Sequence, residues 1–119
     1  MSAIDLTTFA PNSAEELFDG VMSEVAKVLI DNFNKFKRDV AVYLKSVSQK
    51  VWDTQAKLAS GVISAADADI AVQTQELALS NIVLYAPFMT YVTAQNVLDI
   101  VFKVIGAAVR NLTGIDLNF

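Results

Sequence analysis

Between Glu15 and Ala59 the chain reads EELFDGVMSEVAKVLIDNFNKFKRDVAVYLKSVSQKVWDTQAKLA, with apolar side chains at helical spacing and none of the alternation typical of a strand. The apolar residues recur every eleven positions. The three rows are Phe18, Leu29, Val40 and Val51; Met22, Phe33 and Leu44; and Val25, Phe36, Val47 and Leu58. Eleven residues over three turns is about 3.67 residues per turn, close to a straight α-helix. The spacing therefore predicts a long helix and not a left-handed heptad coil.

The ends of this helix are indicated by capping residues. Pro11 disfavours helical geometry at Ala10, and residues 13–16, SAEE, form a capping box. Gly61 is a typical residue just past a helix end. We therefore expect a helix over about 13–60, preceded by an extended arm over residues 1–12. At about 1.5 Å per residue it would be about 65–70 Å long, so it bends near Gly20 or mid-chain, or the molecule is a rod.

The second half of the chain predicts two further helices. Residues 64–67, SAAD, form another capping box and begin a helix over about 64–86. Pro87 either kinks this helix or ends it near Ala86 and opens the next one, over about 88–112, before a short tail. The expected fold is all-α: a long helical hairpin or an elongated three-helix bundle with an N-terminal arm, residues 13–119 forming a single domain.

The last helix is apolar over most of its circumference, and its core rows follow a heptad seam. Such a helix is buried on most sides, which is hard to achieve in a small three-helix monomer, so we expect a partner chain to cover it. The predicted self-association surface consists of Tyr91, Leu98, Val101, Phe102, Ile105, Val109 and Leu112. Leu6 and Phe9 in the arm and Phe119 in the tail are predicted anchors.

Composition excludes several kinds of chemistry. The 119 residues contain no Cys and no His, which excludes thiol catalysis, disulfides, ordinary zinc sites and His-based triads. The net charge of −4 argues against nucleic-acid binding. There is no phosphate-binding glycine loop, nucleophile elbow or carboxylate cluster at metal spacing. We therefore expect no enzyme activity, no cofactor, no metal and no small-molecule substrate.

Charge is distributed unevenly along the chain. Residues 13–60 carry seven acids and seven bases, whereas residues 77–119 carry four charged side chains among 43 residues. Lys35, Lys37 and Arg38 form a basic cluster that could meet phosphate or anionic lipid, but the neighbouring Phe33 and Phe36 belong to the core rows. The polar exterior is therefore expected on the first helix.

Localisation follows from the hydropathy pattern. Residues 1–6, MSAIDL, have neither the basic start nor the apolar run of a signal peptide. The uncharged stretch over residues 77–98 reaches the length of a membrane span, but it contains Pro87 and six polar residues. We expect an intracellular protein, or one inside a particle, and not a membrane-spanning one.

These observations favour a non-enzymatic structural subunit. It would associate with copies of itself or with other subunits through apolar helix faces, in a phage particle, a secretion machine or an intracellular assembly. A lipid- or membrane-active helical protein is the alternative. A small acidic inhibitor or adaptor module is a weaker one.

Overall fold

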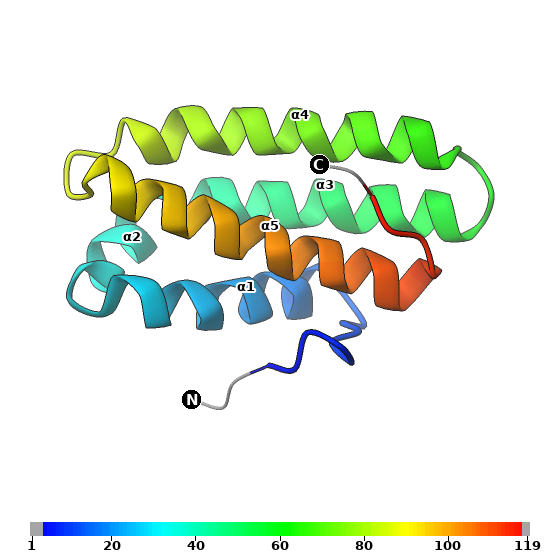
Figure 1. Ribbon diagram of the computed structural model, residues 1–119, viewed down its shortest axis with the longest axis horizontal. Coiled ribbons are helices and arrows are strands. Elements are labelled where there is room, and N and C mark those ends of the chain that lie inside the picture. Colours follow the sequence, from blue (N-terminus) through cyan, green and yellow to red (C-terminus); the bar gives the residue numbers. More distant parts are fainter. Residues whose placement is uncertain (1–3, 118–119) are drawn as a thin grey trace.

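The computed structural model describes residues 4–117, which are all-helical apart from the arm, connections and tail (Figure 1). The elements in chain order are α1 (Ala14–Leu29), the 3₁₀ helix η1 (Ile30–Asn32), α2 (Phe33–Asp39), α3 (Ala41–Ala59), α4 (Ala65–Leu84) and α5 (Tyr91–Thr113). The predicted all-α class is confirmed.

The expected helix over 13–60 is divided into three, so this prediction needs correction. The break begins at Ile30, whose backbone has φ 37° and ψ −83°, and α2 ends where Val40 separates it from α3. Gly20 lies inside α1 and does not bend it. The bend is therefore mid-chain. The molecule measures 41 × 29 × 20 Å, which excludes a rod of about 65–70 Å.

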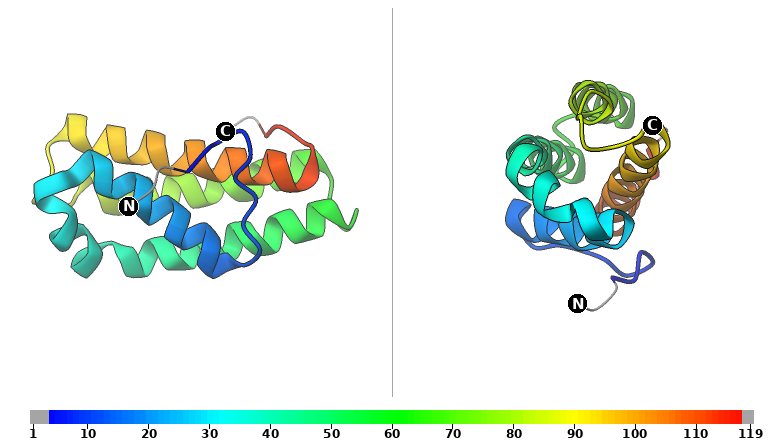
Figure 2. Two further views of the ribbon diagram at one scale, coloured as in Figure 1. Left: turned by 90° about the horizontal axis from the view of Figure 1, so that it is seen from below. Right: turned by 90° about the vertical axis from the view of Figure 1, so that its left-hand side faces the viewer.

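Four long helices pack side by side. α1 contacts α3 and α5, and α4 contacts the same two helices, so α1, α3, α4 and α5 surround one core (Figure 2). Consecutive long helices run in opposite directions, with the short α2 at one end (Figure 1). The break at Ile30 thus gives the bundle four long helices, whereas the sequence predicted a helical hairpin or a three-helix bundle.

Side-chain caps fix the starts of α1, α4 and α5. The Ser13 and Ser64 hydroxyls accept from the backbone N–H of Glu16 and Asp67, each at 3.1 Å. These are the two capping serines expected from the sequence. Thr90 caps α5 in the same way. Because α4 ends at Leu84 and α5 begins at Tyr91, Pro87 lies in a true break and not in a kink.

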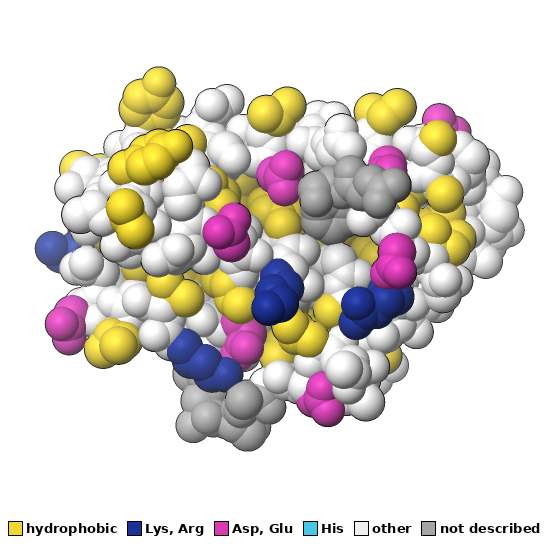
Figure 3. Space-filling view, viewed as in Figure 1, with side chains coloured by type: hydrophobic (Ala, Val, Ile, Leu, Met, Phe, Trp, Pro, Cys, Tyr) yellow, Lys and Arg dark blue, Asp and Glu magenta, His cyan; other side chains and the backbone are white. Residues whose placement is uncertain are grey.

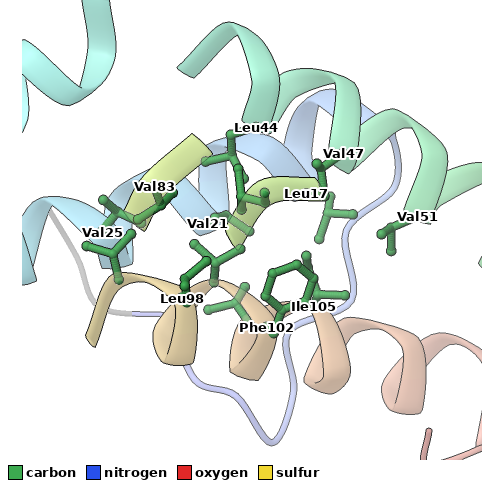
Figure 4. Packing of buried hydrophobic residues seen from close by; sticks show 14 of the residues in the cluster. Leu17, Val21, Val25, Leu44, Val47, Val51, Val83, Leu98, Phe102 and Ile105 are labelled. Atoms are coloured by element: carbon green, nitrogen blue, oxygen red, sulfur yellow. The ribbon is translucent and has the colours of Figure 1, made fainter. Parts of the chain in front are cut away.

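The core collects the apolar faces of all four long helices. Figure 4 shows Val21 and Val25 of α1 facing Leu98 and Phe102 of α5, with α3 side chains completing the cluster. Every residue of the eleven-residue rows is either buried or packed against this core. The rows predicted the buried face even though the helix that carries them is broken.

Candidate interaction surface

The predicted self-association surface on α5 lies mostly inside the chain's own core. Leu98, Val101, Phe102, Ile105 and Val109 are buried against the other helices. Little of these side chains is available to a partner while the bundle stays folded, although Leu98 and Phe102 line an open groove between α4 and α5. We expected a partner chain on α5 because a bundle of three helices could not cover it. The chain forms four long helices, and α1, α3 and α4 all contact α5. Of the remaining two predicted residues, Leu112 is half-buried and Tyr91 is 69% exposed.

The N-terminal arm packs on its own bundle. Leu6 and Phe9 are partly buried against the core. The side-chain amide of Asn111 donates to the backbone oxygens of Leu6, at 3.0 Å, and Phe9, at 2.9 Å. Arg110 also donates to the Leu6 oxygen, at 3.1 Å. Two predicted anchors therefore hold the arm in place within one chain. The third, Phe119, lies outside the described residues.

The outward-facing side of α4 is the longest uncharged surface on a helix here. We call it the α4 face. Its exposed positions are Ile70, Gln73, Thr74, Leu77, Ala78, Asn81 and, just past the helix end, Tyr85. Leu77 is 68% exposed and Tyr85 is 84% exposed. Figure 3 shows hydrophobic side chains standing along the upper edge of the molecule, where Figure 1 places α4.

Apolar side chains also lie exposed at the end of the bundle where α4 connects to α5. Tyr85, Tyr91 and Val92 belong to this end, which we call the apolar end. Ile30 lies in the neighbouring connection, where Asn32, two residues further on, donates to the Phe88 oxygen at 3.3 Å. The α4 face and the apolar end share Tyr85 and so join into one surface.

The charged side chains on α4 itself are all acidic, because the chain has no Lys or Arg between Lys57 and Lys103. Asp67 is exposed in its first turn. Glu76 lies on the flank toward α5, in an open groove of about 390 Å³ whose lining includes Asp99 and Lys103. Among the described residues no group of three His, Cys, Asp or Glu side chains could hold a metal ion.

The basic cluster does not form an open anion site. Phe36 is fully buried, and the Lys37 ammonium lies 5.6 Å from the centre of the Phe33 ring. The Arg38 guanidinium donates to both carboxylate oxygens of Asp39, at 2.9 and 3.2 Å. These hydrogen bonds raise the pKa of Arg38 and lower the pKa of Asp39. Within the described chain, one of the three bases is thus paired and another lies over an aromatic ring.

Among the residues described, one helix, α5, is long and apolar enough to cross a membrane by length and composition. More than half of its most apolar window is buried inside the bundle, as in a core helix. The uncharged stretch over 77–98 is not one helix, because the break at Pro87 divides it.

Comparison with protein-family models, with curated proteins and with solved structures finds no match for this chain.

Most of the surface was missed in the sequence because α4 has apolar residues on all sides. Ala68, Val72, Leu79 and Val83 face the core, while Ile70 and Leu77 face outward. A helix without one dominant apolar side gives no clear indication of which residues a neighbour covers. The seven-residue spacing of Ile70 and Leu77 was the available signal.

Proposed function

We propose that this protein is a non-enzymatic structural subunit that associates with copies of itself through the α4 face and the apolar end. The single observation that carries the proposal is the run of exposed, uncharged positions from Ile70 to Tyr85, which includes two large aliphatic side chains and a tyrosine. Surface helices usually carry charged residues on the side away from the core. The α4 face alone is small, but the apolar end adds Tyr91 and Val92 to it, and large exposed apolar patches mark interaction sites.

The aromatic content of the surface supports a protein contact. Tyr85 and Tyr91 lie at its apolar end, and tyrosine is enriched in the centres of protein interfaces. Charged residues are depleted in such centres, as they are on the α4 face. Assemblies in a phage particle, a secretion machine or an intracellular structure are the settings in which such a small subunit would act.

The experiment is light scattering coupled to size exclusion over a range of protein concentrations. The wild-type mass should rise above 12.9 kDa with concentration. Leu77→Glu should lower this association, because it places a charge in the centre of the α4 face. Val62→Glu is the matched control: Val62 is 70% exposed in the turn after α3, so this variant should associate like the wild type. A wild-type chain that stays monomeric throughout would refute the proposal and favour the inhibitor or adaptor function.

A lipid-active function is the second candidate, and the length and hydropathy of α5 favour it. It requires the bundle to open, since α5 is largely buried. The surface itself offers no base to anionic lipid between Lys57 and Lys103. Flotation with neutral and with anionic vesicles distinguishes the two functions. Binding to vesicles by a chain that remains monomeric in buffer would replace the assembly proposal.

A further inference from the structure

We propose that the occupant of the α4 face is the α4 face of a second copy, packed antiparallel about a twofold axis close to Leu77. This inference rests on the proposed function and specifies its geometry.

The order of side chains along the face is nearly symmetric about Leu77. Ile70 lies seven residues before it and Tyr85 lies eight residues after it, and both are exposed, whereas Leu84 packs partly against the core. Seven residues are close to two turns, so side chains at this spacing share one side of a helix, about 10.5 Å apart along its axis. In an antiparallel pair centred between Leu77 and Ala78, Ile70 lies opposite Tyr85, and Thr74 lies opposite Asn81. Apolar side chains thus face apolar ones, and polar side chains face polar ones.

Charge selects the antiparallel direction over the parallel one. Asp67 is exposed in the first turn of α4, and the helix has no base in its last turn. A parallel pair would bring two Asp67 carboxylates and two positive helix ends together. An antiparallel pair places Asp67 beside the uncharged connection after Leu84, and each helix N-terminus near the C-terminus of its partner. The region between Lys57 and Lys103 contains acids and no bases, so it would also repel a different, acidic protein.

The size of the face predicts a weak dimer. Sixteen residues span about 24 Å, and with a helix width of about 10–12 Å the face covers about 250–300 Å² per protomer. Stable interfaces bury about 800 Å² per partner. The pair is therefore concentration-dependent, and the apolar end beside it remains available for further contacts in an assembly.

Cysteine crosslinking tests the geometry directly, because the chain has no cysteine of its own. Single variants Leu77→Cys and Ile70→Cys, the double variant Ile70→Cys with Tyr85→Cys, and the exposed control Val62→Cys are oxidised at a concentration where the wild type associates. We expect Leu77→Cys to form dimers well above the rate of Val62→Cys, since two copies of residue 77 meet at the axis. Ile70→Cys alone should crosslink no faster than the control, and the double variant should crosslink as readily as Leu77→Cys.

The outcomes separate the failure of this geometry from that of the proposed function. Fast crosslinking of Ile70→Cys alone, without a gain in the double variant, would show a parallel pair and overturn the inference. Association of the wild type by light scattering together with control-level crosslinking of Leu77→Cys would overturn the inference and leave self-association standing elsewhere. A monomeric wild type with control-level crosslinking would overturn both.

Discussion

The ring of Phe9 lies directly on Gly20, in space that a side chain at position 20 would fill. A Cβ atom built on Gly20 would be 2.4 Å from the Phe9 Cζ atom. Gly20 is in the middle of α1, where glycine costs about 1 kcal/mol relative to alanine. The absence of a side chain at Gly20 therefore lets the Phe9 ring pack on α1, at the expense of helix propensity.

Gly20→Ala should release the arm. The added methyl displaces the Phe9 ring, so residues 4–12 should become more accessible to protease and to amide exchange. In a Phe9→Ala background the same change meets no ring, and it should raise the free energy of unfolding by about 1 kcal/mol through helix propensity. If Gly20→Ala left amide exchange in the arm unchanged, the packing of Phe9 on Gly20 would not be what holds the arm.

Asn111 should be the main polar attachment of the arm. Asn111→Ala removes two hydrogen bonds to backbone oxygens that are part-buried, and should lower the free energy of unfolding by about 1–3 kcal/mol in urea. Asn111→Asp should cost more, because it sets a carboxylate against two carbonyl oxygens. Arg110→Ala, which removes one exposed hydrogen bond, is the control and should cost less. Equal costs for all three variants would argue against a specific donor role for Asn111.

Ser48→Ala should stabilise the protein. Ser48 is fully buried on α3, and its hydroxyl has no hydrogen-bond partner. Removing an unsatisfied buried hydroxyl recovers desolvation free energy of about 1 kcal/mol. Thermal and urea unfolding should both shift toward higher stability, while Ser46→Ala at an exposed position of the same helix should change little. A loss of stability in Ser48→Ala would show that the hydroxyl is satisfied in solution.

Ile30→Gly should also stabilise the protein. Ile30 has φ 37° and is 76% exposed, so the isoleucine carries backbone strain without packing in return. Left-handed backbone costs a non-glycine residue about 1–2 kcal/mol, and glycine avoids this cost. Val42→Gly, at an exposed position in the first turn of α3, should instead destabilise by roughly 0.5 kcal/mol. Destabilisation by both variants would mean that the bend at Ile30 is unstrained.

The carboxyl group of Asp5 should titrate at a lowered pKa. The Thr7 hydroxyl donates to Asp5 Oδ1 at 2.7 Å and the Thr7 N–H donates to it at 2.9 Å, which lowers this pKa below its usual 3.8. A lowered folded-state pKa contributes stability above the unfolded value, and the contribution is lost as the pH falls through the folded-state pKa. The turn at residues 5–8 should therefore loosen only in strong acid.

Carbon-13 titration of the Asp5 carboxyl measures this directly. Thr7→Val removes the hydroxyl donor and should raise the pKa of Asp5 toward 3.8. Thr8→Val is the control, because the Thr8 hydroxyl donates to the backbone oxygen of Asp5 and not to its carboxylate. An identical pKa of Asp5 in Thr7→Val and the wild type would refute the assigned cause.

Short-range physics made much of the fold predictable. The helix caps at Ser13 and Ser64 were predictable because each hydroxyl accepts from the backbone N–H only three residues later, so four residues of sequence are enough to recognise the cap. The eleven-residue rows predicted the buried face because a helical repeat stays in register with one core. The break at Ile30 could not be predicted in this way, since Ile-Asp-Asn contains no glycine or proline and the chain turns there against local preference.

The position of this break, which the sequence did not show, also explains why most of the predicted surface on α5 is buried. Without it the chain has three helices, and α5 needs an outside neighbour for residues such as Leu98 and Phe102. Because the break is present, α1 and α3 are separate helices that pack side by side, and both contact α5. Every long helix keeps an outward side, and on α4 that side carries Ile70 and Leu77 because its sequence has no single apolar side.

The attachment of Leu6 and Phe9 to Asn111 also orders events during synthesis. Translation proceeds from the N-terminus at about 5–20 residues per second, so the arm leaves the ribosome long before Asn111 does. α1 likewise waits for α5, its neighbour in the bundle. The nascent chain therefore leaves uncovered the part of α1 that faces α5, including Val21 and Val25, until the last helix emerges (Figure 4). This interval is when a chaperone would have the most surface to bind.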